Sequence, residues 1–295
     1  MTFIVIKYLS KICKAFEDYF CYDYSIINFG GVTMSNNSQP KTPLVTNIFT
    51  ADPSAHVFDG KIYIYPSHDI PHDGEDNDNG DEYRMEDYHI LSLDDITAPC
   101  VDNGEALHLK DIPWASKQLW APDAIERNGT YYLFFPARDM DGIFRIGVAT
   151  SSSPVGPFKA EANYIQGSYS IDPAVFEDDD KKAYVYFGGL WGGQLEKWQT
   201  GSFDENGVGP ALDMPAIGPR VAELTDDLLS FKSEPKEISI VDKDGKPLTA
   251  GDTDRRYFEG PWMHKYNGTY YLSYSTGDTH YLVYATSKNP QEPFT

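Results

Sequence analysis

Three acidic residues far apart in the chain, Asp52, Asp172 and Glu259, each lie one or two positions before a proline. Hydrolysis of a glycosidic bond needs two carboxyl groups, one protonated to donate to the leaving oxygen and one ionised to activate water or attack carbon. A third acid nearby can raise the pKa of the donor by like-charge repulsion. Because aspartate before proline is also a common turn residue, the chemistry depends on whether the fold brings the three together.

A repeated unit contains these prolines. In four copies a proline is followed, seven positions later, by a turn residue: 53 and 60, 122 and 129, 173 and 180, 261 and 268. A segment rich in Tyr and branched residues follows each turn. Asp-Gly and Asn-Gly are the strongest short-range hairpin signals, since both central residues of the favoured turn need positive φ. Three of the turns have this form: Asp59-Gly60, Asn128-Gly129 and Asn267-Gly268. The pattern predicts four β-hairpins.

The repeat predicts an all-β propeller. A third-strand signal follows the hairpin in two units, at 148–151 and 284–287. Successive units are about 69 residues apart, which suits a four-stranded blade with long loops and exceeds the period of helical repeats. Four copies in one register disfavour an ordinary β-sandwich. The first strand of each blade lines the axis, so the three acids should meet at one end of the central channel. Since Thr295 follows the third strand of the fourth unit, a fifth blade would be largely missing.

Composition restricts the partners. The chain has 45 acidic and 24 basic residues and a formal net charge of −21, which argues against nucleic acid and anionic membranes, since both need basic surface. A neutral substrate such as an oligosaccharide fits better, and the 14% of aromatic residues could stack on sugar rings. No apolar run approaches the roughly 20 residues of a membrane span. The sequence does not predict an oligomeric state.

The first 33 residues are expected to be an extension outside the fold, consistent with a misassigned start, because Met34 begins a polar lead-in. Residues 34–295 would form the propeller. The extension is a poor match to a signal peptide. The odd count of three cysteines has no metal-ligand spacing and suits a reducing compartment. We therefore predict a cytoplasmic protein.

The blade starts resemble those of glycoside hydrolase family 43. The motifs are Ala51-Asp52-Pro53-Ser54, Trp120-Ala121-Pro122-Asp123, Ser170-Ile171-Asp172-Pro173 and Glu259-Gly260-Pro261, and the resemblance covers roughly residues 43–295. It implies a five-bladed β-propeller and an inverting mechanism on glycans that contain arabinose or xylose. Matched by position, Asp52 would be the general base, Glu259 the general acid and Asp172 the group that adjusts the pKa of the acid.

In similar enzymes Trp120 would serve as a sugar-stacking platform. Two further candidate substrate-binding residues follow from position in the chain: Trp191 on the glycine-rich loop 188–193, and Asp123 if it faces the channel and is not a turn residue. The implied chemistry requires no cofactor. A fifth-blade histidine of the family often helps to hold a calcium ion near the axis, and the chain stops before that position. A structural calcium in the central channel is thus compatible with the sequence, but no metal ligand can be assigned. The acidic run 72–82 is interpreted as a solvated loop.

The predicted function is that of an exo-acting β-xylosidase or α-L-arabinofuranosidase working on short oligosaccharides. The exo preference rests on the long segment 66–119, which could close one side of a pocket. An endo-arabinanase is the alternative enzyme. A glycan-binding propeller without catalytic activity is the alternative of another class.

Overall fold

The computed structural model of the chain describes residues 5–6, 43–77, 79–277 and 280–295. Regular structure in these residues is almost entirely β, with three short 3₁₀ helices: η1 (Leu109–Asp111), η2 (Trp191–Gly193) and η3 (Leu195–Trp198). The strands form four sheets, and neighbouring strands are antiparallel except where β1 (Val5–Ile6) pairs in parallel with β2.

Each sheet corresponds to one repeated unit and is named here as a blade. Blade 1 contains β2 (Phe49–Phe58), β3 (Lys61–Asp69), β4 (Asp87–Leu93) and β5 (Val101–His108). Blade 2 contains β6 (Asp123–Arg127), β7 (Thr130–Arg138), β8 (Phe144–Ser151) and β9 (Lys159–Ala160). Blade 3 contains β10 (Ala174–Glu177), β11 (Ala183–Phe187), β12 (Arg220–Glu223) and β13 (Lys236–Glu237). Blade 4 contains β14 (Tyr257–Tyr266), β15 (Thr269–Thr276) and β16 (Leu282–Ser287).

The predicted hairpins are confirmed. Each blade begins with two antiparallel strands joined at the expected turn. In the three Asp-Gly and Asn-Gly turns both residues have positive φ: 50° and 81° at Asp59-Gly60, 54° and 78° at Asn128-Gly129, and 48° and 71° at Asn267-Gly268. Both central positions are therefore left-handed, as two-residue hairpin turns require. The predicted third strands fall within β8 and β16.

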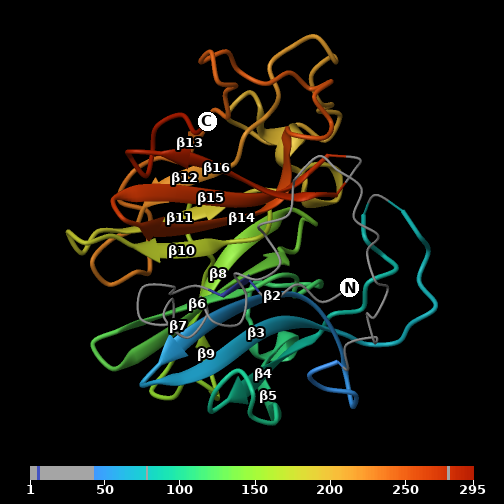
Figure 1. Cartoon of the computed structure of the whole chain (residues 1–295). Helices are drawn as coiled ribbons and strands as arrows, with labels where there is room; N and C mark the ends of the chain where they lie inside the picture. Colours follow the sequence, from blue (N-terminus) through green and yellow to red (C-terminus); the bar gives the residue numbers. More distant parts are fainter. Residues whose placement is uncertain (1–4, 7–42, 78, 278–279) are drawn as a thin grey trace, which may run out of the picture.

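The blades follow one another in chain order (Figure 1). Their innermost strands are in contact from β2 to β6, from β6 to β10 and from β10 to β14. Three apolar clusters fill the spaces between neighbouring blades, because alternate side chains of a strand point to opposite faces of its sheet. They include Tyr65 with Leu133, Phe134 with Val185, and Tyr186 with Leu272. The chain is thus an all-β propeller with four blades.

Most of the predicted 1–33 extension lies outside the described residues, as do residues 34–42. The exception is β1, whose two residues pair with Ser54 and Ala55 of β2. Within the part of the chain that the structure describes, no helix is long and apolar enough to cross a membrane.

Candidate active site

A β-bulge places Asp52 at the start of the innermost strand of blade 1. The pairing of β2 with β3 passes from Ala51 to Ser54 while β3 advances by two residues, so Asp52 and Pro53 leave the ladder. Asp52 has a φ of 45°, a left-handed conformation that is uncommon for a residue with a side chain. Such conformations persist where the surrounding structure enforces them, and bulges are used to redirect a side chain next to active sites.

Blade 4 repeats this bulge. The pairing of β14 with β15 passes from Glu259 to Trp262, and Gly260 and Pro261 leave the ladder. Gly260, with a φ of 63°, occupies the position before the proline that Asp52 occupies in blade 1, and glycine adopts this conformation without steric strain. Relative to the proline of an equivalent bulge, Glu259 therefore lies one residue earlier in blade 4 than Asp52 does in blade 1.

Blade 3 presents Asp172 from the same conformation. This residue has a φ of 57° and directly precedes Pro173, just before β10. Its Oδ2 accepts a hydrogen bond of 2.9 Å from the backbone N–H of Gly260. The bond joins the starts of the innermost strands of blades 3 and 4.

The structure brings the three carboxyl groups together, as predicted. Burial raises the pKa of Asp172 well above its usual value, and the charges of Glu259 and Asp52 raise it further. Burial, followed by the charge of Asp52, raises the pKa of Glu259 to about 7. Burial, followed by the charge of Asp69, raises the pKa of Asp52. Since like charges in this site disfavour one another, the cluster retains protons at a pH where free carboxyls are ionised.

These carboxyls are crowded by protein but remain open to solvent. The residue Asp52 is exposed, and Asp172 and Glu259 are partly exposed. Dense protein around each group nevertheless penalises its charged form. The three carboxyls are thus closely surrounded by protein and still within reach of a substrate.

The loop after β11 packs against Glu259. A Cβ atom at Gly189 would lie 3.3 Å from Glu259 Cβ and 2.6 Å from Ile171 Cδ1, so this close approach needs a residue without a side chain. The hydroxyl of Tyr257, on the innermost strand of blade 4, donates to the carbonyl oxygen of Gly188. The glycine-rich loop is thereby held beside the predicted general acid.

This geometry agrees with the comparison to known proteins. The family described as Glycosyl hydrolases family 43 matches residues 41–295. The chain belongs to this family. Its relatives include Xylosidase/arabinosidase 43A of Humicola insolens, 61% identical over 86% of this chain and 80% of the relative. Another is the xylosidase/arabinosidase of Bacteroides ovatus, 55% identical over 86% of this chain and 79% of the relative.

Solved structures of family 43 share the fold. CoXyl43, a β-xylosidase/α-arabinofuranosidase from a compost microbial metagenome, was solved in complex with xylotriose in a calcium-free form. It is 63% identical to this chain, with a TM-score of 0.84 over 86% of this chain and 78% of that one. A GH43_1 enzyme of Xanthomonas citri complexed with xylotriose is 52% identical, with a TM-score of 0.81 over 86% of this chain and 74% of that one.

Trp191 of this family 43 enzyme lies on the loop beside Glu259. The residue is 41% exposed. Its ring centroid is 5.2 Å from that of Phe258, the residue before Glu259, and the Arg256 guanidinium lies 5.3 Å from the ring centroid. An exposed, supported indole close to the acid has the form of a stacking platform. Its contact with sugar stays a prediction.

Trp120 is more enclosed. It is partly exposed, and its ring packs 4.7 Å from that of Phe144. A Cβ atom at Gly80 would lie 2.3 Å from the Trp120 ring, so the 79–83 loop passes directly against the indole. The indole nitrogen is buried without a hydrogen-bond partner among the described residues. Stacking of a sugar on the exposed part of the Trp120 ring stays a prediction.

Asp123 does not lie where a substrate could touch it, and that prediction is wrong. The residue is 1% exposed. Its Oδ2 accepts a hydrogen bond of 2.7 Å from the Val175 N–H, and its Oδ1 lies 2.5 Å from His56 Nε2. Asp123 therefore connects blades 1, 2 and 3 from within. Motif matching could not separate a channel-lining carboxylate from one buried between the inner strands.

Sequence reasoning missed Asp69. Its charge helps to raise the pKa of Asp52. The signal was the hairpin register: counting from the Asp59-Gly60 turn brings Asp69 opposite the stretch just before Asp52. The bulge shifts the register by one residue, so Asp69 pairs with Phe49. It missed Phe258 as well, which supports Trp191.

The channel carboxyls do not form a ready calcium site. Calcium can occur in the family, since one relative is described in a calcium-free form. Calcium takes six to eight oxygen ligands. Among the described residues, the group of three His, Cys, Asp or Glu side chains close enough to share an ion lies on blade 1 and includes none of Asp52, Asp172 and Glu259. We derive no catalytic step through calcium.

Proposed function

We propose that this family 43 enzyme is an exo-acting, inverting glycosidase that releases xylose or arabinose from xylo- and arabino-oligosaccharides. The main observation behind this proposal is that burial and the charge of Asp52 raise the pKa of Glu259 to about 7. The site thus keeps a proton donor near neutral pH beside a second carboxyl. The named activities of the relatives and the xylotriose complex of CoXyl43 support the substrate class.

In the proposed reaction, ionised Asp52 takes a proton from water as the water oxygen bonds to the anomeric carbon. Protonated Glu259 gives its proton to the glycosidic oxygen as the bond from that carbon breaks on the opposite face. The sugar leaves with inverted configuration. Afterwards Asp52 holds the proton and Glu259 is ionised, so a proton exchange with solvent restores the starting state. Asp172 has the pKa-adjusting role in this proposal. Its carboxyl interacts by charge with that of Glu259, which raises the pKa of Asp172, and its hydrogen bond to the Gly260 N–H fixes the bulge beside Glu259.

The exo preference has structural support at the second blade start. Gln118 Nε2 donates to the carbonyl oxygens of Asn79 and Gly80, both at 2.7 Å, and Lys117 Nζ lies 2.5 Å from Asp81 Oδ1. These bonds hold part of the long 66–119 segment against Trp120. A fixed segment beside the stacking residue would close one end of the binding site, as an exo enzyme requires.

We further propose that the complete ring has five blades, with the remaining sector between blade 4 and blade 1. Aromatic side chains on the blade 4 sheet favour this, since the tilted rings of Tyr271 and Tyr284 have centroids 5.6 Å apart and Tyr284 is 66% exposed. A cytoplasmic location remains our proposal from the cysteine pattern. A structural calcium in the channel would need ligands other than a shared set of the three carboxyls.

The first test is the product configuration. We expect ¹H NMR of fresh digests of a β-xyloside to show α-xylose first, and β-xylose as the first product would overturn the inverting mechanism. Asp52→Asn should lower kcat/KM about 10²–10⁴-fold on both xylobiose and nitrophenyl xyloside. Glu259→Gln should lose much less on nitrophenyl xyloside, since this leaving group needs little protonation. Asp94→Asn, an exposed aspartate of blade 1, is the matched control. Equal losses of Glu259→Gln on the two substrates would contradict the acid assignment.

The alternatives give different results. An endo-arabinanase would rapidly lower the viscosity of linear arabinan and release mixed oligosaccharides, whereas we expect single pentoses. A glycan-binding module would bind xylo-oligosaccharides, as measured by calorimetry, but would not hydrolyse them. This result would hold even for a longer chain that includes the fifth sector.

A further inference from the structure

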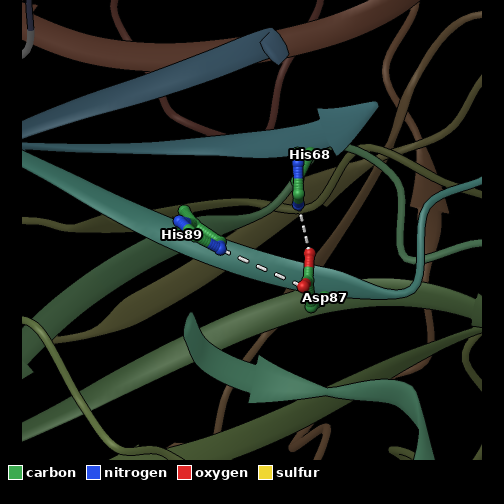
Figure 2. Close-up of side chains that lie close together, drawn as sticks. All are labelled: His68, Asp87 and His89. Carbon is green, nitrogen blue, oxygen red and sulfur yellow. Dashed lines mark hydrogen bonds and ion pairs between the residues drawn. The ribbon is translucent and has the colours of Figure 1, made fainter. Parts of the chain in front are cut away.

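Two histidines and an aspartate form a cluster on blade 1 that the proposed reaction does not use. Figure 2 shows His68 on β3 and Asp87 and His89 on β4 pointing toward one another. His68 Nδ1 lies 2.5 Å from Asp87 Oδ1, and His89 Nε2 lies 4.0 Å from Asp87 Oδ2. One ligand atom from each residue can be chosen so that all three lie within 4.8 Å of one another.

The cluster occupies a place where two strands separate. The ladder between β3 and β4 runs from Ile62 with Leu93 to Ile64 with Leu91 and does not reach His68 or Asp87. Beyond the ladder, the backbone N–H of Ile70 donates a 2.9 Å hydrogen bond to the carbonyl oxygen of Arg84. Between this bridge and the ladder, the His68 and Asp87 side chains connect the two strands. The three side chains are 15%, 13% and 17% exposed, so an ion from solvent could reach them.

The imidazole of His89 is oriented by a second carboxylate. Its Nδ1 lies 2.9 Å from Asp102 Oδ1, and Asn47 Nδ2 donates to Asp102 Oδ2 at 2.7 Å. With Nδ1–H donated to Asp102, the lone pair of neutral His89 is on Nε2, the nitrogen that faces Asp87. A metal-binding histidine almost always donates its other N–H to a carboxylate, carbonyl or water.

We propose that His68, Asp87 and His89 bind a divalent transition-metal ion of the zinc type. The ligands would be His68 Nδ1, one Asp87 oxygen and His89 Nε2, with water in the fourth position. Two imidazoles and one carboxylate suit zinc, whereas calcium prefers oxygen ligands alone. Ligands of one tetrahedral zinc ion lie about 3.4 Å apart, so the 2.5 Å pair must open and the 4.0 Å pair must close by small side-chain rotations.

The ion would tie the separated ends of β3 and β4 together. Its site is on the sheet of blade 1 and not among the channel carboxyls, so its role would be structural. The adjacent Asp69 raises the pKa of Asp52, which places the tied strand end next to the predicted base.

The test is a titration of chelator-treated protein with Zn²⁺, followed by calorimetry and by the thermal unfolding midpoint. We expect one ion per chain and a higher midpoint with zinc. Asp87→Asn and His89→Ala should each weaken zinc binding at least tenfold, and Asp102→Asn about 10–100-fold. His72→Ala, an exposed histidine outside the cluster, should bind like the wild type. An Asp52→Asn, Glu259→Gln double variant should do the same.

The proposal is overturned if wild-type protein binds no zinc, if His89→Ala binds it unchanged, or if only the channel double variant loses it. Crystals of the wild type soaked in Zn²⁺ give a reading that does not depend on the folding of any variant. An anomalous peak between the three side chains would support the site. The proposal would be rejected if zinc occupied other sites fully and gave no peak between these side chains. None of these measurements depends on catalytic activity. If the zinc site is rejected, the proposed function is therefore unaffected.

Discussion

The backbone N–H of Gly260 donates a 2.9 Å hydrogen bond to Oδ2 of Asp172. This bond ties the carboxyl of blade 3 to the residue that follows Glu259 in blade 4. The carboxyls of Asp172 and Glu259 also interact by charge. Asp172 can therefore act on the proposed general acid in two ways, electrostatically and by fixing the bulge from which Glu259 projects.

Two substitutions separate these effects. Asp172→Asn keeps an oxygen that can accept from Gly260 but cannot ionise, whereas Asp172→Ala loses both properties. We expect kcat/KM on xylobiose to fall about 10-fold or more in Asp172→Asn and further in Asp172→Ala. The alkaline limb of the pH profile should move down by up to about 1 unit in Asp172→Asn, because the charge interaction between the two carboxyls is removed. Equal losses with an unmoved limb would show that Asp172 serves neither role.

The pH dependence of kcat/KM should be bell-shaped. As the proposed general acid, Glu259 must be protonated. Burial with the charge of Asp52 raises its pKa to about 7, so kcat/KM should fall about tenfold per unit above that pH. As the proposed general base, Asp52 must be ionised, and its pKa is raised by burial and by the charge of Asp69. Asp69→Asn should therefore move the acid limb to lower pH. Rate profiles of both proteins on nitrophenyl xyloside test this, and an acid limb that moves upward would contradict it.

Glu259 should reduce stability at neutral and alkaline pH. Its folded pKa of about 7 exceeds the reference value of 4.5, so the folded protein binds the proton more tightly than the unfolded chain. The resulting stabilisation is complete below the unfolded pKa and is lost as pH rises through the folded pKa. Glu259→Gln does not titrate and should exceed wild type by up to about 3 kcal/mol above pH 7, with little difference at pH 4. Urea unfolding at both pH values measures this. Glu234→Gln, at an exposed position, should show no such trend.

Asp123 should matter for stability and not for substrate binding. Asp123→Ala removes the acceptor of the buried Val175 N–H and the partner of His56, and we expect a loss of about 2–4 kcal/mol in the free energy of unfolding. KM on xylobiose should stay within about twofold for the folded fraction. A large rise in KM with unchanged stability would restore the binding role that the sequence suggested. Asp94→Asn again serves as the control.

Local features of the fold could be predicted from the sequence because they depend on short-range chemistry. Both residues of Asp59-Gly60 or Asn267-Gly268 must be left-handed in a tight hairpin, and such dipeptides fix the turn and the register of the two strands that follow. The constant spacing from proline to turn then placed Asp52, Asp172 and Glu259 at equivalent blade positions, and their convergence followed from the propeller.

Tertiary structure alone decided how each acid behaves. Whether a carboxyl is surrounded by protein, open to solvent or paired across blades depends on contacts between segments dozens of residues apart. Asp123 and Asp172 look alike in their motifs, yet one is buried against Val175 and the other shares the channel with Glu259. The raised pKa of Glu259 and the meeting of His68 with Asp87 likewise arise only when separate strands are packed, since desolvation and charge interactions act through space and not along the chain.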